Sequence, residues 1–414
     1  MTDLTAYSRE TAARLLPFDV FDPDFHRDPY PRYRELQDAH GGWCRTSADS
    51  VAVFGFEEAA AVLRDPRFGI GEHPMIADQF VADPVDGGSG RPVMFLDPPD
   101  HTRVRALAGR AFTARVVDRL RPHAEEHART LLRDAAAGSD GGEFDLRAAF
   151  AAPLPALVLS RLMDIPERYH PLFFASVKDS ARGLDPGFTL TDEQKAGRTI
   201  ARDLFIEAGL EMAEERRRDP GDDLVSDLVR AEQAGDRLSS WELALLLLNL
   251  LAAGFSTTTA ALCSAVHNLL DHPDQLAWLR DHPDRVADAA EELLRYDPML
   301  QVTTRMTVQD ADIAGTPLPA GQHVVVVLGA ANRDPRAFDR PDTLDLTRPP
   351  GRTLAFGQGI HFCVAAPIAR LVVRVGLEAL IRYRIERGGR GPERWPGTFM
   401  RVIGELPVRL TPVR

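Results

Sequence analysis

The sequence predicts one large, mainly α-helical domain with small β-sheets, spanning residues 1–414. Helical apolar patterns dominate from Pro99 to about Tyr296, and strand-like and turn-like segments follow. We find no internal repeat and no clear linker that would divide the chain. With 44% hydrophobic residues, the chain has enough apolar side chains for an ordinary globular core.

The first third is expected to mix short helices and strands. The segment "DPYPRYRELQDA" predicts a helix after a Pro-rich entry, and "SVAVFG" predicts a strand that ends in a turn. The segment "FEEAAAVLRDP" predicts a helix that Pro66 ends. From Gly69 to Arg91 the composition shifts to Gly, Asp and Pro, which predicts a long irregular loop of the kind that is usually functional or disordered.

A long helix should cross the middle of the domain. Ser239 and Glu242 fit a capping box at its start, and His272-Pro273 should end it, which gives about 45–50 Å of helix. Its central stretch, "LLAAGFSTTTAAL", places a glycine and four successive hydroxyl residues inside a helix. Glycine costs roughly 1 kcal/mol there, and Ser and Thr compete for backbone groups. Because breaches of local preference tend to mark functional sites, this stretch is a candidate site.

The last part of the chain should contain helices, strands and turns. A helix is expected from about Asp284 to Tyr296, and Pro298 ends it. Strands and turns should follow in "MTVQDADIAGTPLPAGQHVVVVL", and the last helix should follow Cys363. A strand pair around "GTFMRVIGELPVRL" is expected to close the chain.

Charge and cysteine content exclude several classes of protein. The net charge of −12 argues against a general nucleic-acid binder. Cys44, Cys263 and Cys363 lie far apart without CxxC spacing, which fits neither a disulfide framework nor a zinc ribbon and suits the reducing cytoplasm. The first residues lack the apolar core of a signal peptide, and the longest apolar run, Leu243 to Leu248, is too short for a membrane span. We therefore expect a cytoplasmic protein, a monomer, with neither nucleic acid nor membrane as a partner.

The most informative stretch is "AFGQGIHFCVAAPIAR", residues 355–370, which we call the cysteine loop. Gly357 and Gly359 allow positive φ or close approach to a bulky group. Cys363 precedes a helix with Pro367 in its first turn, where free N–H groups and the helix dipole favour a thiolate. A lone cysteine at such a position is more often a small core residue, so its position alone does not decide its role.

The spacing Phe-x-Gly-x-Gly-x-His-x-Cys resembles the haem-binding loop of the cytochrome P-450 family. The resemblance implies the P-450 fold, haem b (iron protoporphyrin IX) as cofactor and the Cys363 thiolate as the ligand of its iron. It also implies that Phe356 and Gly357 lie beside the haem. One departure is Ala365, where the family usually has Gly, and we expect it to tighten the fit under the porphyrin.

Other segments resemble the same family. Glu292 and Arg295 match its Glu-x-x-Arg, and Arg348 stands where the third member of that structural triad is expected. From the helical pattern alone, Glu292 and Arg295 lie off the apolar face and would form an ordinary solvated pair. The resemblance implies instead that the triad braces the segment leading to the cysteine loop.

Haem brings two propionates into a partly buried place, and buried charges must be paired. The helix segment "DPPDHTRVRALAGRAF" resembles the family's segment with His and Arg four apart, here His101 and Arg105. "VTTRM" resembles the strand with a further propionate-binding arginine, here Arg305, and His361 is the fourth candidate. Without the resemblance, His101 and Arg105 would be taken for a solvated basic helix face.

The unusual stretch of the long helix also resembles the family. Ala253 and Gly254 would leave room for O₂ above the iron, and Thr257 would be the proton-relay threonine. Ser256 stands where an Asp or Glu is usual, and a serine hydroxyl passes a proton but holds no charge. We take these four residues as the catalytic group, and Thr259 as polar filler.

By resemblance, the chain is a monooxygenase that inserts one atom of O₂ into a small organic substrate by hydroxylation or epoxidation, in secondary or specialised metabolism. Electrons would come from NAD(P)H through a ferredoxin reductase and a ferredoxin that docks near the cysteine loop. Two alternatives stay open because of Ser256. One is a haem-thiolate enzyme of oxidative coupling or cyclisation without oxygen insertion, and the other is a haem-binding protein without turnover.

The substrate pocket is expected to be mostly apolar. The resemblance implies that its roof comes from the loop 69–94, from residues 171–191 and from the turn at Phe399-Met400. Arg91, Arg182 and Arg401 are each expected either to meet a substrate carboxylate or to be solvated. The residues expected to line it are Met94, Leu250, Leu300, Val302, Phe399 and Met400.

Overall fold

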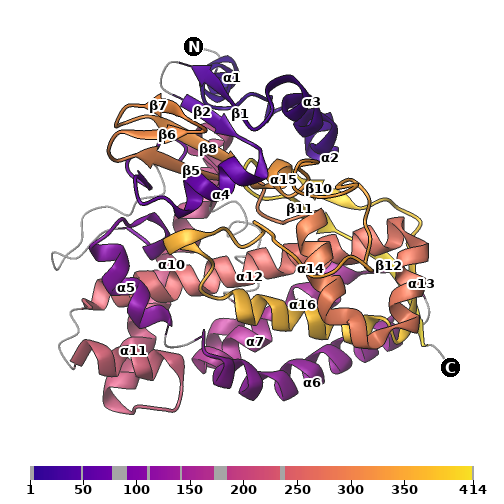
Figure 1. Cartoon of the computed structure of the whole chain (residues 1–414). Helices are drawn as coiled ribbons and strands as arrows, with labels where there is room; N and C mark the ends of the chain where they lie inside the picture. Colours follow the sequence, from indigo (N-terminus) through magenta and orange to yellow (C-terminus); the bar gives the residue numbers. More distant parts are fainter. Residues whose placement is uncertain are drawn as a thin grey trace.

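The computed structural model describes residues 4–47, 50–76, 91–109, 112–139, 142–171, 184–233 and 238–412. Figure 1 shows a part rich in strands, with the first helices around it, above a larger part built from helices. Helix α12 (Ser240–Asp271) crosses the helical part from side to side. This mainly helical arrangement with small sheets confirms the predicted fold class.

The largest sheet has five strands in the order β1 (Trp43–Ser47), β2 (Ser50–Val53), β8 (His323–Val327), β5 (Val302–Thr307) and β3 (Phe68–Gly69). Side chains alternate between its faces, as the period of two requires. Val51 and Val53 pack with α4 (Phe56–Arg64), whereas Ala52 packs with α1 (Leu4–Leu15) and α3 (Tyr30–His40). The apolar run of β8 has no polar alternation because both faces of the sheet are buried.

Three smaller sheets complete the strand content of the described residues. They are β6 (Ala311–Ile313) with β7 (Thr316–Leu318), β10 (Glu393–Trp395) with β11 (Val402–Glu405), and β9 (Tyr383–Arg387), β12 (Pro407–Pro412) and β4 (Phe144–Asp145). The predicted strand pair at the end of the chain is therefore wrong, since β11 and β12 belong to different sheets. Only Leu406 separates them, and a hairpin needs a longer turn.

Helix α12 begins and ends as the sequence predicts. The side chain of Ser239 accepts the backbone N–H of Glu242, and the Glu242 carboxylate accepts the N–H of Ser239. At 1.5 Å per residue, its 32 residues extend over about 48 Å. Its length and composition would suit a membrane span, but 72% of its apolar window is buried inside the protein, as in the core helix of a globular domain.

The other helices surround α12. Those in contact with it include α7 (Pro153–Met163), α10 (Asp192–Arg218), α11 (Leu224–Gln233), α13 (Pro273–Asp281), α14 (Val286–Tyr296) and α16 (Ala366–Leu380). The remaining helices are α2 (Pro23–Arg27), α5 (Asp100–Gly109), α6 (Ala114–Gly138) and α15 (Leu328–Ala331). Short 3₁₀ helices are η2 (Val93–Phe95), η5 (Glu167–Tyr169), η6 (Gly187–Thr189), η7 (Pro283–Arg285) and η8 (Gly359–His361). A π-helix, η4, spans Arg147–Ala151.

Helix α14 differs from its predicted amphipathic pattern. Glu292 and Arg295, expected on a solvated face, are buried, with side-chain exposures of 3% each. The chain at residues 332–348 covers that face of the helix, and backbone carbonyls of Asn332 and Pro341 accept hydrogen bonds from Arg295. The interpretation of Glu292 and Arg295 as a surface pair is therefore wrong, because it assumed that only the apolar face of this helix is covered.

Candidate functional site

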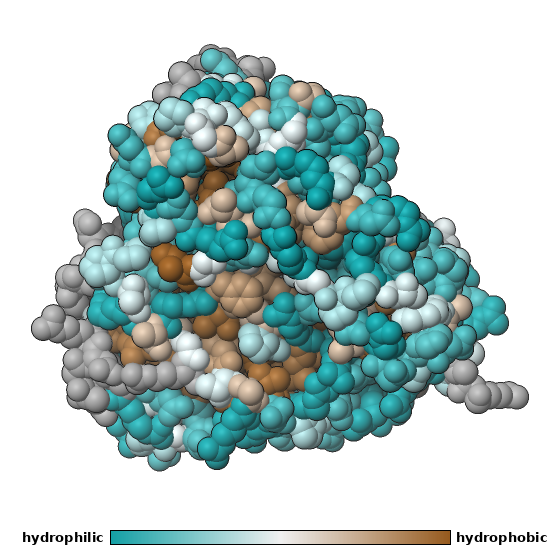
Figure 2. Space-filling model, viewed as in Figure 1, coloured by the Kyte–Doolittle hydropathy of each residue, from teal (hydrophilic) through white to brown (hydrophobic). Residues whose placement is uncertain are grey.

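A cavity of about 250 Å³ lies between the middle of α12, the start of α16 and strand β5. Cys363 lines it from the cysteine loop, Thr257 from α12 and Arg305 from β5. These segments lie far apart in the sequence, so the fold brings the predicted motifs to one place. Figure 2 shows apolar side chains gathered in the middle of the drawn face, between the sheet-rich and the helical parts of Figure 1.

Cys363 has a free thiol directly before α16. Burial raises the pKa of this thiol, while the backbone N–H groups of Ala365 and Ala366 and the charges of Arg105 and Arg370 act in the opposite direction. The helix start therefore contributes as expected, but burial outweighs it and favours the thiol. A coordinating metal ion would reverse this balance, because it deprotonates a thiol that binds it.

Two glycines shape the loop before the cysteine. Gly357 and Gly359 have φ values of +68° and +71°, in the region that favours glycine. A side chain at Gly359 would lie 2.0 Å from the carbonyl oxygen of Leu63 in α4. Glycine is thus required here for two reasons, the backbone conformation and the close approach of α4.

Four cationic or imidazole side chains line the same cavity: His101, Arg105, Arg305 and His361. Arg305 is 4% exposed and donates to the carbonyl of Thr304 at 2.7 Å. Arg105 donates to the carbonyl of Phe362. Neither guanidinium has a carboxylate within salt-bridge distance among the described residues. Burial lowers the pKa of Arg305 to about 10, as expected for a cation without a close counter-ion.

The two histidines lie against each other. The ring centroids of His101 and His361 are 4.3 Å apart, and the buried Nε2 of His361 has no hydrogen-bond partner among the described residues. Burial and then the charge of Arg305 lower the pKa of His361 to about 2, and burial also lowers the pKa of His101. Both rings are therefore neutral near pH 7, and His361 has a free nitrogen that a bound group can use.

These features fit haem. The buried guanidinium of Arg305 and the half-buried one of Arg105, both without a carboxylate partner among the described residues, suit two propionates, and the unpartnered Nε2 of His361 suits one of their oxygens. The free thiol of Cys363 suits the iron, and the side chains of Phe356 and Ala365 line the cavity next to it. The site residues predicted for the cofactor thus lie together around one cavity.

The middle of α12 forms one wall of the cavity. The hydroxyl of Thr257 donates to the carbonyl of Ala253 at 2.5 Å, and Ala253, Gly254 and Thr257 all line the cavity. A side chain at Gly254 would meet Cδ1 of Leu159 at 3.2 Å. The glycine therefore admits Leu159 of α7, which also lines the cavity, so its lack of a side chain serves helix packing at this wall.

Ser256 lies elsewhere. It is 5% exposed, its hydroxyl donates to the carbonyl of Ala252 at 2.7 Å, and it is not among the residues that line the cavity. An acid at this position would likewise act from behind the cavity wall. Ser256 thus lies behind the wall of the cavity that Thr257 lines.

Five of the six residues predicted for the substrate pocket line the cavity: Met94, Leu250, Leu300, Val302 and Phe399. The placement of Met400 there is wrong, since it is 2% exposed and packs in the core of the helical part. Neighbouring residues of an extended segment point to opposite sides, so Phe399 and Met400 cannot both face the cavity. Ile70 and Leu184 come from the predicted roof segments, whose residues 77–90 and 172–183 lie outside the described ones.

The arginines predicted to meet a substrate carboxylate do not line this cavity within the described residues. Arg91 donates to the carbonyl of Gly71, and Arg401 is buried in an ion pair with Asp297, with 3.0 Å between the charged atoms. Arg182 lies outside the described residues. Arg401 therefore does not meet a substrate in this cavity, because it pairs with Asp297 in the protein interior.

Some lining residues were missed by the sequence analysis. Asn249 donates to the sulfur of Met94 at 3.1 Å, and Thr258 follows Thr257 on the cavity wall. A polar residue inside the run "LLLLNLL" was a signal for Asn249. Leu159 has no such signal, because its place depends on how α7 packs against α12.

The predicted triad forms behind the cysteine loop. Arg295 and Glu292 form a two-pronged ion pair, with 2.7 and 2.8 Å between the bonded atoms. Nε of Arg348 donates to the same carboxylate at 3.2 Å. The backbone N–H of Asp345 donates to it as well, at 3.2 Å, so the triad ties α14 to the segment that leads to the cysteine loop.

Comparison with known proteins gives consistent matches. The family model described as Cytochrome P450 matches residues 191–393. Cytochrome P450 107B1 of Saccharopolyspora erythraea is 36% identical over 404 residues, which cover 94% of this chain and 97% of that protein. The 6-deoxyerythronolide B hydroxylase of the same organism is 35% identical over 414 residues, which cover 95% of this chain and 98% of that protein.

A similar solved structure is P450BioI in complex with an acyl carrier protein that carries hexadec-9Z-enoic acid. Its TM-score is 0.83 at 30% identity, over 94% of this chain and 100% of the matched one. The fold thus agrees over nearly the whole chain.

Proposed function

This chain belongs to the cytochrome P450 family, whose members bind haem b, and on that premise we propose that it is a monooxygenase of bacterial specialised metabolism. It would insert one atom of O₂ into a small organic substrate by hydroxylation or epoxidation. The observation that carries the proposal is one cavity that brings together the free Cys363 thiol, the guanidinium groups of Arg105 and Arg305, and the Thr257 hydroxyl. A relative of comparable length is named as a hydroxylase, which supports this reaction.

Haem, when bound, would supply the activation of O₂ and the transfer of oxygen. The sulfur of Cys363 would ligate its iron, and His101, Arg105, Arg305 and His361 would neutralise and bind its carboxylates. These residues fix the position and the electrostatic surroundings of the cofactor.

Thr257 would handle protons. Its hydroxyl lies on the cavity wall and donates to the Ala253 carbonyl, so the lone pairs of its oxygen remain available to accept a hydrogen bond from a water in the cavity. Ser256, behind the wall and bonded to Ala252, would replace the usual acid by passing a proton without storing charge. Apolar neighbours such as Leu250 and Val302 would exclude bulk water and hold an apolar or amphipathic substrate.

Electrons would come from NAD(P)H through a ferredoxin reductase and a ferredoxin, and the protein would act in the cytoplasm as a monomer. The cysteine loop offers a docking surface, because Ile360 and Phe362 are exposed large apolar residues, with exposures of 46% and 39%. Arg103 and Arg352 are the basic residues that we propose for the attraction of an acidic ferredoxin. Both have acidic neighbours, since Arg103 pairs with Glu242 and Arg352 with Glu57, so we expect the apolar residues to contribute most of the contact.

One experiment separates this proposal from oxidative coupling and from haem binding without turnover. The haem-loaded protein is reduced under CO, and its absorption spectrum should show thiolate ligation that Cys363→Ser abolishes. A reaction with ¹⁸O₂, ferredoxin, reductase and NADPH should then give a product with one labelled oxygen. An oxidised product without label would establish coupling, and thiolate-ligated haem without oxidation of any tested substrate would favour the non-catalytic alternative.

A further inference from the structure

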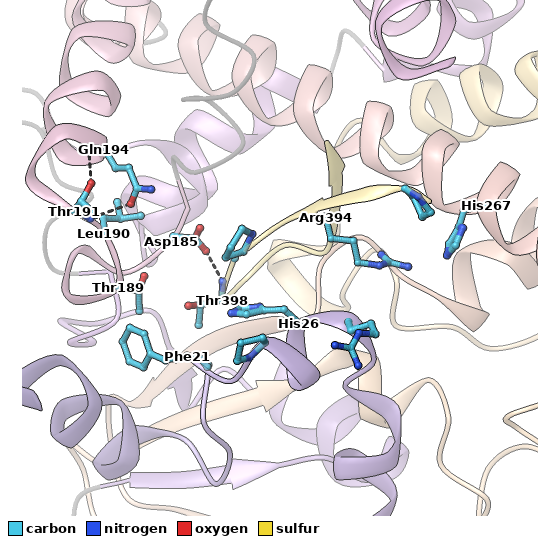
Figure 3. A pocket seen from close by; sticks show the side chains of 16 residues that line it. Phe21, His26, Asp185, Thr189, Leu190, Thr191, Gln194, His267, Arg394 and Thr398 are labelled. Atoms are coloured by element: carbon cyan, nitrogen blue, oxygen red, sulfur yellow. Dashed lines mark hydrogen bonds between the residues drawn. The ribbon is translucent and has the colours of Figure 1, made fainter. Parts of the chain in front are cut away.

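A second pocket of about 780 Å³ lies outside the haem cavity (Figure 3). It is bounded by the loop before α2, the start of α10, the end of α12 and the segment 392–398. Its charged lining residues within the described chain are Arg27, Asp185 and Arg394, and His26 and His267 add two imidazoles. None of these residues takes part in the proposed oxygen chemistry.

Arg394 is the unusual member of this pocket. Its Nη1 is buried and has no hydrogen-bond partner among the described residues, and no carboxylate there lies within salt-bridge distance of its guanidinium. Burial, followed by the charge of Arg401, lowers the pKa of Arg394 to about 10. Arg394 is half-buried as a residue, but a guanidinium nitrogen that is shielded from water without a partner is costly, so an anion at Nη1 would supply the contact that this side chain lacks.

Nearby carboxylates are already engaged by other groups. Asp297 accepts hydrogen bonds from the hydroxyls of Tyr30 and Ser264, at 2.6 and 2.7 Å, and forms an ion pair with Arg401. Asp185 accepts the backbone N–H groups of Thr398 and Phe399, at 2.7 and 3.1 Å. Figure 3 shows Asp185 directed to Thr398, whereas Arg394 extends away from it toward His267.

The other cation and the imidazoles do not compete with Arg394 for an anion. Arg27 is 75% exposed at its side chain and pairs with Asp24. Burial is the main cause that lowers the pKa of His26, and it also lowers the pKa of His267 to about 4. Both rings are therefore neutral near pH 7. The neutral ring of His26 can hydrogen-bond to an oxyanion without adding charge, whereas His267 is already engaged, because its Nδ1 accepts from Arg387 at 3.2 Å and its Nε2 lies 3.4 Å from Asp271.

We infer that this outer pocket binds the oxyanion of an organic acid, a carboxylate or a phosphate monoester, with Arg394 as its anchor. A guanidinium fork matches either group with two parallel hydrogen bonds. The acid has two sources. It is either the polar end of a molecule whose apolar part reaches the haem cavity, or a separate ligand of the outer pocket. The two pockets are neighbours, because Leu184 and Phe399 line the inner one and Asp185 and Thr398 line the outer one.

The test uses the haem-loaded protein with octanoate as the probe and octanol as its uncharged counterpart. Calorimetric titration should show octanoate binding at least about tenfold more tightly than octanol, since a hydrogen bond to a charged group is stronger than one between neutral groups. Arg394→Gln should weaken octanoate binding at least tenfold. Arg394→Lys should keep part of it, and Arg27→Gln should change it less than twofold.

The absorption spectrum of the haem, followed during the same titration, identifies the source of the acid. A change of spin state together with octanoate binding would show that the apolar chain reaches the inner cavity. Binding without a spectral change would show a separate ligand site. Octanoate and octanol binding equally well, or Arg394→Gln binding octanoate as the wild type does while its CO spectrum is unchanged, would overturn the inference.

Discussion

Gly359 illustrates how a single residue can fix the position of the proposed iron ligand. It lies four residues before Cys363, has positive φ, and faces the backbone of Leu63 and Arg64 in α4. The sequence motif predicts the special backbone. The contact with α4 was not predictable, because nothing local indicates which helix passes that close.

We predict that Gly359→Ala destabilises the protein by at least about 2 kcal/mol, since it combines a strained φ with a clash against the carbonyl oxygen of Leu63. The loop would move away from α4, so the haem content of the purified protein should also fall. Urea unfolding and the ratio of haem to protein absorbance measure the two effects.

Gly138→Ala is the matched control. Gly138 ends α6, its φ is not positive, and nothing lies within 4 Å of the added methyl group. This change should be neutral or stabilise by up to about 1 kcal/mol. Equal stability of the two variants would contradict the role given to Gly359.

At the scale of elements, the sequence predicted where helices begin and end, but it did not predict which of their faces are buried. The capping box of α12 and the proline after it act within a few residues, so the sequence shows them directly. The burial of Glu292 and Arg295 depends on residues 332–348, which follow much later in the chain. A helical pattern identifies one apolar face and cannot show that a distant segment covers another.

We predict that Glu292→Gln costs about 3–5 kcal/mol of unfolding free energy, because it leaves the buried guanidinium of Arg295 without its charge partner. Arg348, which pairs with the same carboxylate, should lose this ion pair, so the segment before the cysteine loop should be less firmly attached to α14. Urea unfolding of the haem-loaded protein measures the cost.

The control is Glu35→Gln, which breaks the pair with Arg32 at the same spacing of three residues but on the surface, where Glu35 has 64% side-chain exposure. Its cost should be below about 0.5 kcal/mol. If both substitutions cost equally little, the triad would not brace the segment.

For the whole molecule, the family motifs were enough to predict the fold class and most of the site, because each motif keeps its spacing along the chain. Whether a residue faces the cavity or is buried behind its wall was less predictable. Ser256 and Met400 are adjacent in sequence to lining residues, yet both are buried behind the cavity. Such placements depend on the rotation of a helix or strand within the packed molecule.

The pH dependence of overall stability follows from buried histidines. His73 is fully buried, its Nδ1 accepts the N–H of Met75 at 3.2 Å, and the ring of His323 lies 4.9 Å away. Burial, followed by repulsion from a charged His323, lowers the pKa of His73 from 6.5 to about 3. The folded protein therefore keeps the ring neutral while the unfolded chain takes up a proton below pH 6.5.

Since the unfolded state binds more protons in this window, stability must fall as the pH falls from 6.5 toward 3. We predict that His73 contributes about 1.4 kcal/mol of this loss per pH unit. His73→Asn keeps an acceptor for the Met75 N–H and cannot be protonated, so its unfolding free energy should fall less steeply in urea titrations at pH 7, 6, 5 and 4. His40→Asn, at an exposed position, should follow the wild-type curve. Parallel curves for the wild type and His73→Asn would mean that the ring is already protonated, or solvated, in the folded protein.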